Sequence, residues 1–114
     1  MIILLGFYCK KPGLTAEEFS NHWRDVHGPL FKVPQITQYV RRYVQHHVRI
    51  IAPGRNRSMD FDGFSEVWFD SKEDSVSFAS EPYFLETIVP DEAMFLDPSR
   101  TMVLMRDKQS VQIP

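Results

Sequence analysis

Apolar residues near the start of the chain recur with the period of a helix. Four of them form a single stripe at helical spacing: Phe19, Trp23, Val26 and Leu30. Thr15 can cap the first turn, and Glu18, three residues later, completes a capping box. The pattern therefore predicts an amphipathic helix that begins directly after Thr15.

The residues that follow the stripe predict where this helix ends. Pro29 would clash with the carbonyl of Asp25, and Gly28 can adopt the left-handed conformation that closes a helix. We therefore predict that the helix ends near His27. At about 100° per residue, His27 lies roughly 60° to one side of the apolar stripe and His22 roughly 80° to the other.

The remaining pattern is mostly that of strands. Four stretches are predicted as strands: 2–9, 38–50, 63–69 and 100–106. In the third stretch, Phe64, Glu66 and Trp68 lie on one face and the residues between them on the other. Loop residues over 52–58 separate the second stretch from the third.

A second helix is predicted between the last two strands. Ser71 can cap it, with Asp74 three residues later, and Pro82 interrupts it. A further helical piece follows and is expected to end at Pro90. The order of elements predicts an α+β fold: a ferredoxin-like βαββαβ sandwich with a four-stranded antiparallel sheet and helices on one face.

This architecture leaves the other face of the sheet without helices. Strands rich in Tyr, Val, Phe and Trp would expose a large apolar patch if that face met water. Pairing with a second copy covers the patch, so we expect a homodimer whose sheets pack together. We expect one domain over residues 1–108, and a C-terminal tail over 109–114 that is a candidate for closing the partner's pocket.

Composition narrows the classes of function. The 114 residues are 43% hydrophobic and 25% charged, which is typical of one globular domain, and the net charge of -2 does not indicate a nucleic-acid partner. The opening apolar run is too short to span a membrane and lacks the features of a signal peptide. The lone Cys9 fits a reducing, cytoplasmic location. Aromatic residues make up 13% of the chain, which suggests a flat pocket for a small molecule or an apolar interface.

His27 is the first candidate for chemistry. The helix C-terminus favours its charged form, whereas burial beside Trp23 favours the neutral form. A histidine under two opposing influences can transfer protons near neutral pH, although a structural histidine bonded to the backbone fits the pattern as well. His22 and His27 are five residues apart and diverge, so we expect no metal site.

Three stretches together resemble a known family. They are 22–30 (HWRDVHGPL), 63–71 (GFSEVWFDS) and 90–97 (PDEAMFLD). In this order they resemble the EthD-domain family of the dimeric α+β barrel superfamily, whose fold is the sandwich expected above. The family is named for a protein that accompanies alkyl ether degradation. Its relatives include isomerases and lyases of muconolactones, and fungal decarboxylases and dehydratases of aromatic polyketides, which use no cofactor.

The resemblance also implies site residues. In the methylmuconolactone isomerase branch, a histidine at the end of the first helix and a tyrosine on the second strand form the catalytic cleft. These positions match His27 and Tyr39. That branch also uses strand cysteines, and this chain has only Cys9, so the resemblance does not extend to that route of lactone isomerisation.

If His27 and Tyr39 face one cleft, they suit enolate chemistry. Neutral imidazole takes a proton beside a carbonyl, and the phenol donates a hydrogen bond to the enolate oxygen. Isomerisation, dehydration, cyclisation and decarboxylation all become available without a metal or an organic cofactor. Six further residues are candidates for contacting the substrate: His22, Trp23, Phe7, Tyr43, Glu66 and Trp68.

Some of these residues have a second interpretation. Glu66 could be a buried acid, or could pair with Arg41 or Arg42. The whole protein could equally be a non-catalytic accessory protein that binds a small ligand in a degradation pathway, such as alkyl ether breakdown. Haem handling or quinol oxidation, found elsewhere in the superfamily, is a weaker hypothesis because no residues match it.

Overall fold

A computed structural model describes residues 1–48 and 61–107 of the chain. Its elements are β1 (Ile2–Tyr8), α1 (Ala16–His22), a π turn (Trp23–His27), a 3₁₀ turn (Gly28–Phe31), α2 (Pro34–Thr37), β2 (Val40–His47), β3 (Gly63–Phe69), α3 (Lys72–Ser80), a second π turn (Phe84–Ile88), α4 (Val89–Glu92), a second 3₁₀ turn (Pro98–Arg100) and β4 (Met102–Asp107). The strands form an antiparallel sheet in the order β2-β3-β1-β4.

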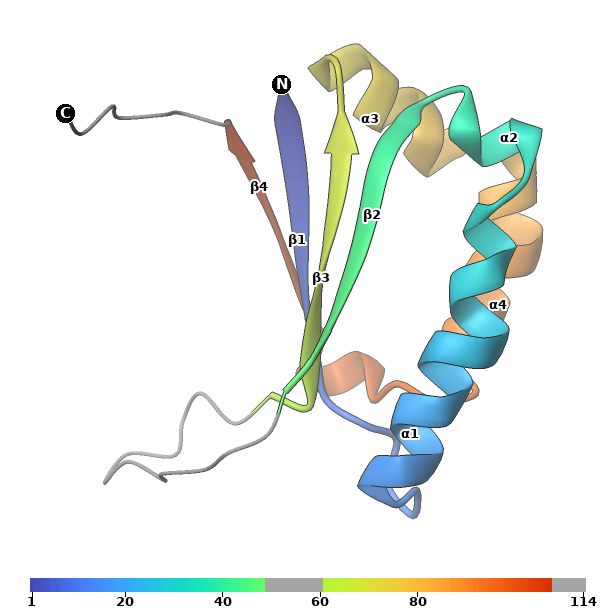
Figure 1. Cartoon of the computed structure of the whole chain (residues 1–114), viewed down its shortest axis with the longest axis vertical. Helices are drawn as coiled ribbons and strands as arrows, with labels where there is room; N and C mark the ends of the chain where they lie inside the picture. Colours follow the sequence, from blue (N-terminus) through green and yellow to red (C-terminus); the bar gives the residue numbers. More distant parts are fainter. Residues whose placement is uncertain (49–60, 108–114) are drawn as a thin grey trace, which may run out of the picture.

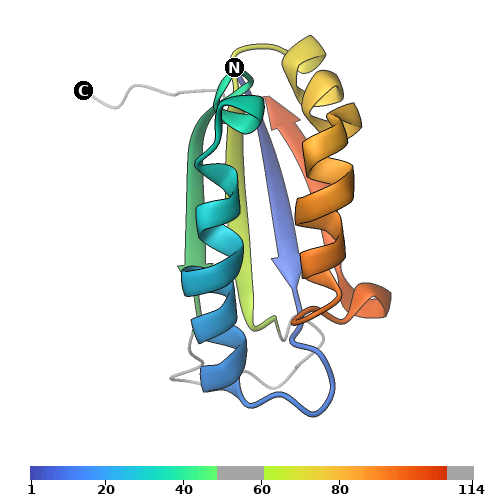
Figure 2. The ribbon, with the colours of Figure 1, turned by 90° about the vertical axis from the view of Figure 1, so that its right-hand side faces the viewer.

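The helices form one layer on one face of this sheet (Figure 1). The arm from α1 to α2 runs beside β2, and the arm from α3 to α4 lies nearer β1 and β4 (Figure 2). The predicted α+β sandwich is therefore confirmed.

Within the described part of the chain, no helix is long and apolar enough to cross a membrane. The predicted tail over 109–114, the loop over 52–58 and the predicted strand end at 49–50 lie outside the described residues.

Both predicted helix caps are present. Glu18 donates its backbone N–H to Thr15 Oγ1 at 3.1 Å, and Thr15 donates its own to Glu18 Oε1 at 2.9 Å. Asp74 donates its N–H to Ser71 Oγ at 3.1 Å. These short-range signals fix where each helical arm begins and therefore where its side chains meet the sheet.

The predicted ends of two helical segments are wrong. Gly28 keeps a right-handed φ of -54°, and its N–H donates to Trp23 O in the π turn. The helical arm then continues as a 3₁₀ turn that begins with Gly28 and Pro29 and reaches Phe31. Pro90 likewise lies in the first turn of α4 rather than after a helix. A proline is tolerated in a first turn because its missing N–H has no helical partner there.

The π turn also corrects the predicted apolar stripe. Bonding to the fifth preceding residue puts more residues into each turn than an α-helix has, so residues four apart stay on one face. The buried side chains follow this spacing: Phe19, Trp23, His27 and Phe31. Val26, predicted to lie in the stripe, is 47% exposed. His27 therefore points directly at the sheet instead of lying beside the apolar stripe.

Candidate active site

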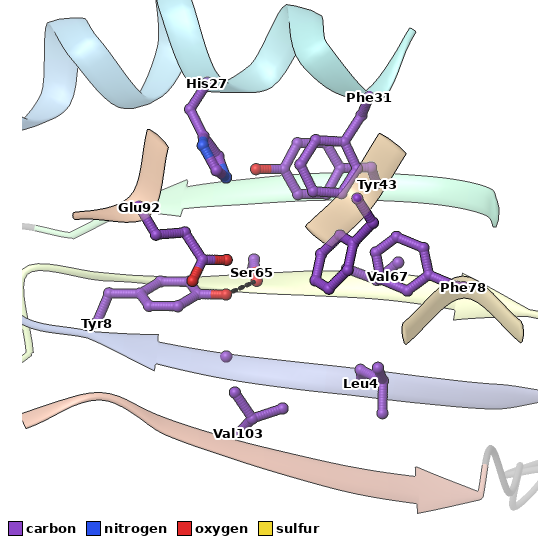
Figure 3. Close-up of a pocket in the computed structure, with 12 residues that line it drawn as sticks. Leu4, Tyr8, His27, Phe31, Tyr43, Ser65, Val67, Phe78, Glu92 and Val103 are labelled. Carbon is purple, nitrogen blue, oxygen red and sulfur yellow. Dashed lines mark hydrogen bonds between the residues drawn. The ribbon is translucent and has the colours of Figure 1, made fainter. Parts of the chain in front are cut away.

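A cavity of about 100 Å³ lies between the helical layer and the sheet (Figure 3). Its walls are mostly apolar: Leu4, Gly6, Phe31, Val67, Phe78, Phe84 and Val103. Five polar side chains also line it: Tyr8, His27, Tyr43, Ser65 and Glu92. Val103 on β4 is 59% exposed, which places the opening of the cavity beside this strand. An apolar cavity with a few convergent polar groups is typical of a small-molecule site.

His27 is held by a carboxylate on the other helical arm. Its Nδ1 lies 2.8 Å from Asp91 Oδ2, while Asp91 Oδ1 lies 2.9 Å from His22 Nε2. A carboxylate only accepts hydrogen bonds, so Nδ1 carries the proton and Nε2 of a neutral ring carries the lone pair. Nε2 makes no hydrogen bond to any described residue.

Burial keeps this histidine neutral. The pKa of His27 is lowered from its ordinary value, chiefly because burial disfavours the charged ring, although Asp91 acts in the opposite direction. The ring points into the cavity (Figure 3). A neutral imidazole oriented by a carboxylate, with its unprotonated nitrogen available, is arranged as a proton acceptor.

Tyr43 supplies a hydrogen-bond donor beside His27. Its hydroxyl oxygen accepts from Trp23 Nε1 at 3.2 Å and from Gln45 Nε2 at 3.0 Å. Because both neighbours donate, the hydroxyl proton is left to donate elsewhere. Burial raises the pKa of Tyr43 far above its ordinary value, so the group stays a phenol. Its ring stacks on Phe31 with centroids 4.0 Å apart, and its hydroxyl points toward His27 (Figure 3).

The opposite side of the cavity is formed by Tyr8 and Ser65. Their hydroxyl groups lie 2.9 Å apart, and burial raises the pKa of Tyr8. The Tyr8 ring lies back over Gly6, where a Cβ would come within 2.0 Å of the Tyr8 hydroxyl. Gly6 therefore provides the space in which this phenol reaches Ser65.

Glu92 is the carboxylic acid among the residues that line the cavity. It ends α4, directly after Asp91, and its half-buried side chain makes no hydrogen bond to the described residues. Burial, assisted by the negative charge of Asp91, raises the pKa of Glu92 to about 7. A large share of Glu92 side chains would therefore hold a proton at neutral pH.

The expected convergence of His27 and Tyr39 is not seen. Tyr39 lies in the turn before β2, where it packs against the core, and it does not line the cavity. Tyr43, four residues later, faces the helical layer and stands beside His27 instead. Of the expected substrate contacts, only Tyr43 lines the cavity. Trp23 contacts the site indirectly, through its hydrogen bond to Tyr43, and His22 does so through its hydrogen bond to Asp91.

Three other expected contacts lie on the opposite face of the sheet. Phe7 stacks on Phe64, with ring centroids 5.8 Å apart. Glu66 accepts from Trp68 Nε1 at 2.8 Å and lies 2.5 Å from His46 Nε2. None of these side chains lines the cavity that holds His27.

Neither arginine expected to pair with Glu66 forms an ion pair with it among the described residues. Hydrogen bonds from His46 and Trp68 lower the Glu66 pKa, and the charge of Arg42 lowers it further. The Arg41 guanidinium lies 2.8 Å from Asp70. Arg42 lies over the Trp68 ring, 5.2 Å from its centroid. The face of the sheet away from the helices therefore has its own cluster of polar and aromatic side chains, separate from the cavity.

Sequence reasoning missed Glu92, Tyr8 and Ser65 as cavity residues, and it missed Asp91 as the partner of His27. Asp97, later in the same segment, has a local role instead, because it accepts the N–H of Ser99 at 3.0 Å in the turn before β4. The sequence signal for both acidic residues is that Asp91 and Glu92 are adjacent carboxylates directly after Pro90, close to the buried residues Phe95 and Leu96. Among residues 1–48 and 61–107, no group of three histidine, cysteine, aspartate or glutamate side chains is arranged to hold a metal ion.

Comparison with known proteins gives matches over most of the chain. The EthD domain matches residues 11–99. A protein of Claviceps purpurea named decarboxylase is 30% identical over 103 residues, which cover 82% of this chain and 73% of that protein. The dehydratase ustZ of Ustilaginoidea virens is 25% identical over 111 residues, which cover 90% of this chain and 78% of that protein.

Solved structures share the fold at lower identity. An EthD family protein of Bacillus halodurans superposes with a TM-score of 0.69 at 19% identity, covering 96% of this chain and 99% of that one. A Bacteroides fragilis protein described as dimeric and ferredoxin-like gives a TM-score of 0.64 at 10% identity, covering 94% and 95% of the two chains.

Proposed function

Because this chain belongs to the EthD-domain family, we propose that it is a cofactor-free lyase that forms an enolate on a ring-bearing carbonyl compound. The observation that carries the proposal is the pairing of neutral His27, oriented by Asp91, with the Tyr43 hydroxyl in one apolar cavity. The relatives named decarboxylase and dehydratase support a lyase over an isomerase.

The two candidate reactions share one intermediate. In loss of water, His27 Nε2 takes the proton alpha to the carbonyl, and the enolate then expels the hydroxyl group beta to it. In loss of CO₂ from a β-keto acid, the electron pair of the broken C–C bond forms the enolate directly. In both, the Tyr43 O–H donates to the developing enolate oxygen.

The size of the cavity restricts which part of a substrate reacts inside it. A volume of about 100 Å³ is smaller than a cavity of 150 Å³ that binds benzene, so it holds at most one ring or the reacting end of a larger molecule. The apolar walls suit a flat ring, and the rest of the substrate extends past Val103 toward solvent. We infer that the reacting carbonyl enters and that the body of the substrate stays nearer the opening.

Two tetralone probes test this function. One carries a carboxylate alpha to its ketone and releases CO₂; the other carries a hydroxyl beta to its ketone and yields a naphthol on loss of water. We expect the protein to accelerate at least one of these reactions without added metal or cofactor. Binding of the naphthol without turnover of either probe would instead favour the non-catalytic accessory protein.

We also propose that the protein is a homodimer whose sheets pack face to face. By strand register, Met102 and Leu104 share the face of Phe7, away from the cavity, and they are 50% and 46% exposed. Apolar side chains in this position are stabilised when a second copy covers them. The dimeric description of the Bacteroides fragilis protein supports this arrangement.

Sedimentation tests the dimer directly. At micromolar concentration we expect the mass of two chains, and Leu104→Glu should shift it to one chain because a charge would be buried between the sheets. Val76→Glu is the matched control, because Val76 is 57% exposed on α3, in the helical layer. A wild-type chain that sediments as a monomer would contradict the proposal.

A further inference from the structure

One carboxyl group in the cavity, that of Glu92, has no role in the reaction as described so far. Glu92 lines the cavity from α4, on the side formed by Tyr8, whereas His27 and Tyr43 occupy the side nearer the other helical arm (Figure 3). Burial is the main cause of the raised pKa of Tyr8 and Tyr43, and the negative charge of Glu92 also raises both, which places its carboxyl near the two phenols.

The surroundings of Glu92 favour its protonated form. Its titratable neighbours are Asp91 on its own helix, His27 on the first helical arm, and the phenols Tyr8 on β1 and Tyr43 on β2. None of these four groups is a cation when His27 is neutral, so none stabilises the ionised form of Glu92. The negative charge of Asp91 disfavours that form further. The groups facing it from β3 and β4, Ser65 and Val103, are uncharged.

We propose that Glu92 is the catalytic proton donor of this site, a role that rests on the lyase function proposed above. In loss of water, the C–O bond breaks, its electron pair leaves with the hydroxyl group, and the Glu92 proton converts that group to water. In loss of CO₂, the Glu92 proton goes to the carbon that held the carboxylate. Glu92 regains a proton from solvent in either case, and after loss of water His27 releases to solvent the proton that it took from the substrate.

The assignment gives His27 and Glu92 complementary tasks. A base must be unprotonated and an acid protonated at the same pH, which requires environments that act on the two groups differently. Burial does this here, because it disfavours charge on both groups: the pKa of His27 is lowered and that of Glu92 is raised to about 7. Turnover of the hydroxyl-bearing probe should therefore fall on the acid side as His27 gains a proton, and turnover of both probes should fall above about pH 7 as Glu92 loses its own.

Glu92→Gln tests the proposal through turnover. We expect at least about a hundredfold loss at neutral pH, the lower end of the usual contribution of general acid catalysis, and loss of the alkaline limb of the pH–rate profile. Glu86→Gln is the matched control, because Glu86 is exposed on the π turn of the same helical arm. If the wild type turns over a probe and Glu92→Gln keeps the same alkaline limb, the role of Glu92 is overturned while the lyase function is left intact.

Thermal unfolding of the same variants needs no substrate. A raised pKa in the folded state gives stability that is present at low pH and is lost as pH rises from about 4.5 to about 7. The melting temperature of Glu92→Gln minus that of the wild type should therefore increase across this window and then level off. A difference that stays constant with pH would overturn the proposal. Failure of the wild type to turn over either probe would overturn the lyase function and the proton-donor role with it.

Discussion

His27→Gln is expected to abolish most turnover of the hydroxyl-bearing tetralone, with a loss of about 10²–10⁴-fold. The variant keeps a polar, neutral side chain next to Asp91 but has no nitrogen lone pair to accept the substrate proton. Binding of the naphthol product should change little, because the apolar walls are retained. Initial rates and a fluorescence titration of naphthol binding measure the two effects separately.

The same variant separates the two candidate reactions. Loss of CO₂ creates the enolate without removing a proton from carbon, so His27→Gln should slow the carboxylate-bearing probe much less than the hydroxyl-bearing one. Thermal unfolding controls for a structural role, because loss of the Asp91 contact alone would lower the melting temperature. Full dehydration by a folded His27→Gln protein would rule out His27 as the base.

Tyr43→Phe is the second variant with a large expected effect. It removes the hydroxyl that donates to the enolate oxygen, and loss of one such donor lowers kcat by about 10²–10³-fold. Both probes should be affected, since both reactions pass through an enolate. The change also leaves the N–H groups of Trp23 and Gln45 without their acceptor, so a stability loss of about 1–3 kcal/mol is expected as well.

Tyr39→Phe is the informative comparison for this variant. The resemblance to muconolactone isomerases assigns the catalytic phenol to Tyr39, whereas the cavity is lined by Tyr43. We expect kcat to fall in Tyr43→Phe and to stay near the wild-type value in Tyr39→Phe, with both measured at saturating probe. The reverse order would restore Tyr39 to the catalytic role and contradict the role proposed for Tyr43.

Local sequence signals predicted most of the fold. The Thr15 and Ser71 caps act within three residues, and the alternation over 63–69 has the period of the strand itself. Such features depend only on the backbone geometry of a short segment and not on contacts with the rest of the chain. The order of elements then admits few topologies, so the ferredoxin-like sheet followed from the same signals.

The parts that could not be predicted depend on longer-range or non-ideal geometry. Asp91 reaches His27 across 64 positions in the sequence, and no local pattern encodes that contact. The choice of Tyr43 over Tyr39 depends on where β2 begins, because Tyr39 precedes its first residue, Val40. The boundaries of helices and strands are the least certain parts of any sequence-based assignment. The candidate site depends on two of them, the end of the first helical arm and the start of β2.

The π turn gives the first helical arm one residue more than an ordinary α-helix needs to place the same side chains on the sheet. Deleting one residue between Trp23 and His27 would allow α-helical bonding, and His27 and Phe31 would then stand three and seven residues after Trp23. Residues at this spacing share one face of an α-helix, so Phe31 would stay on the side of the Tyr43 ring on which it stacks. A relative that is one residue shorter here can therefore present the same residues to the sheet. An alignment with such a relative needs a one-residue gap between Trp23 and His27 to match those residues.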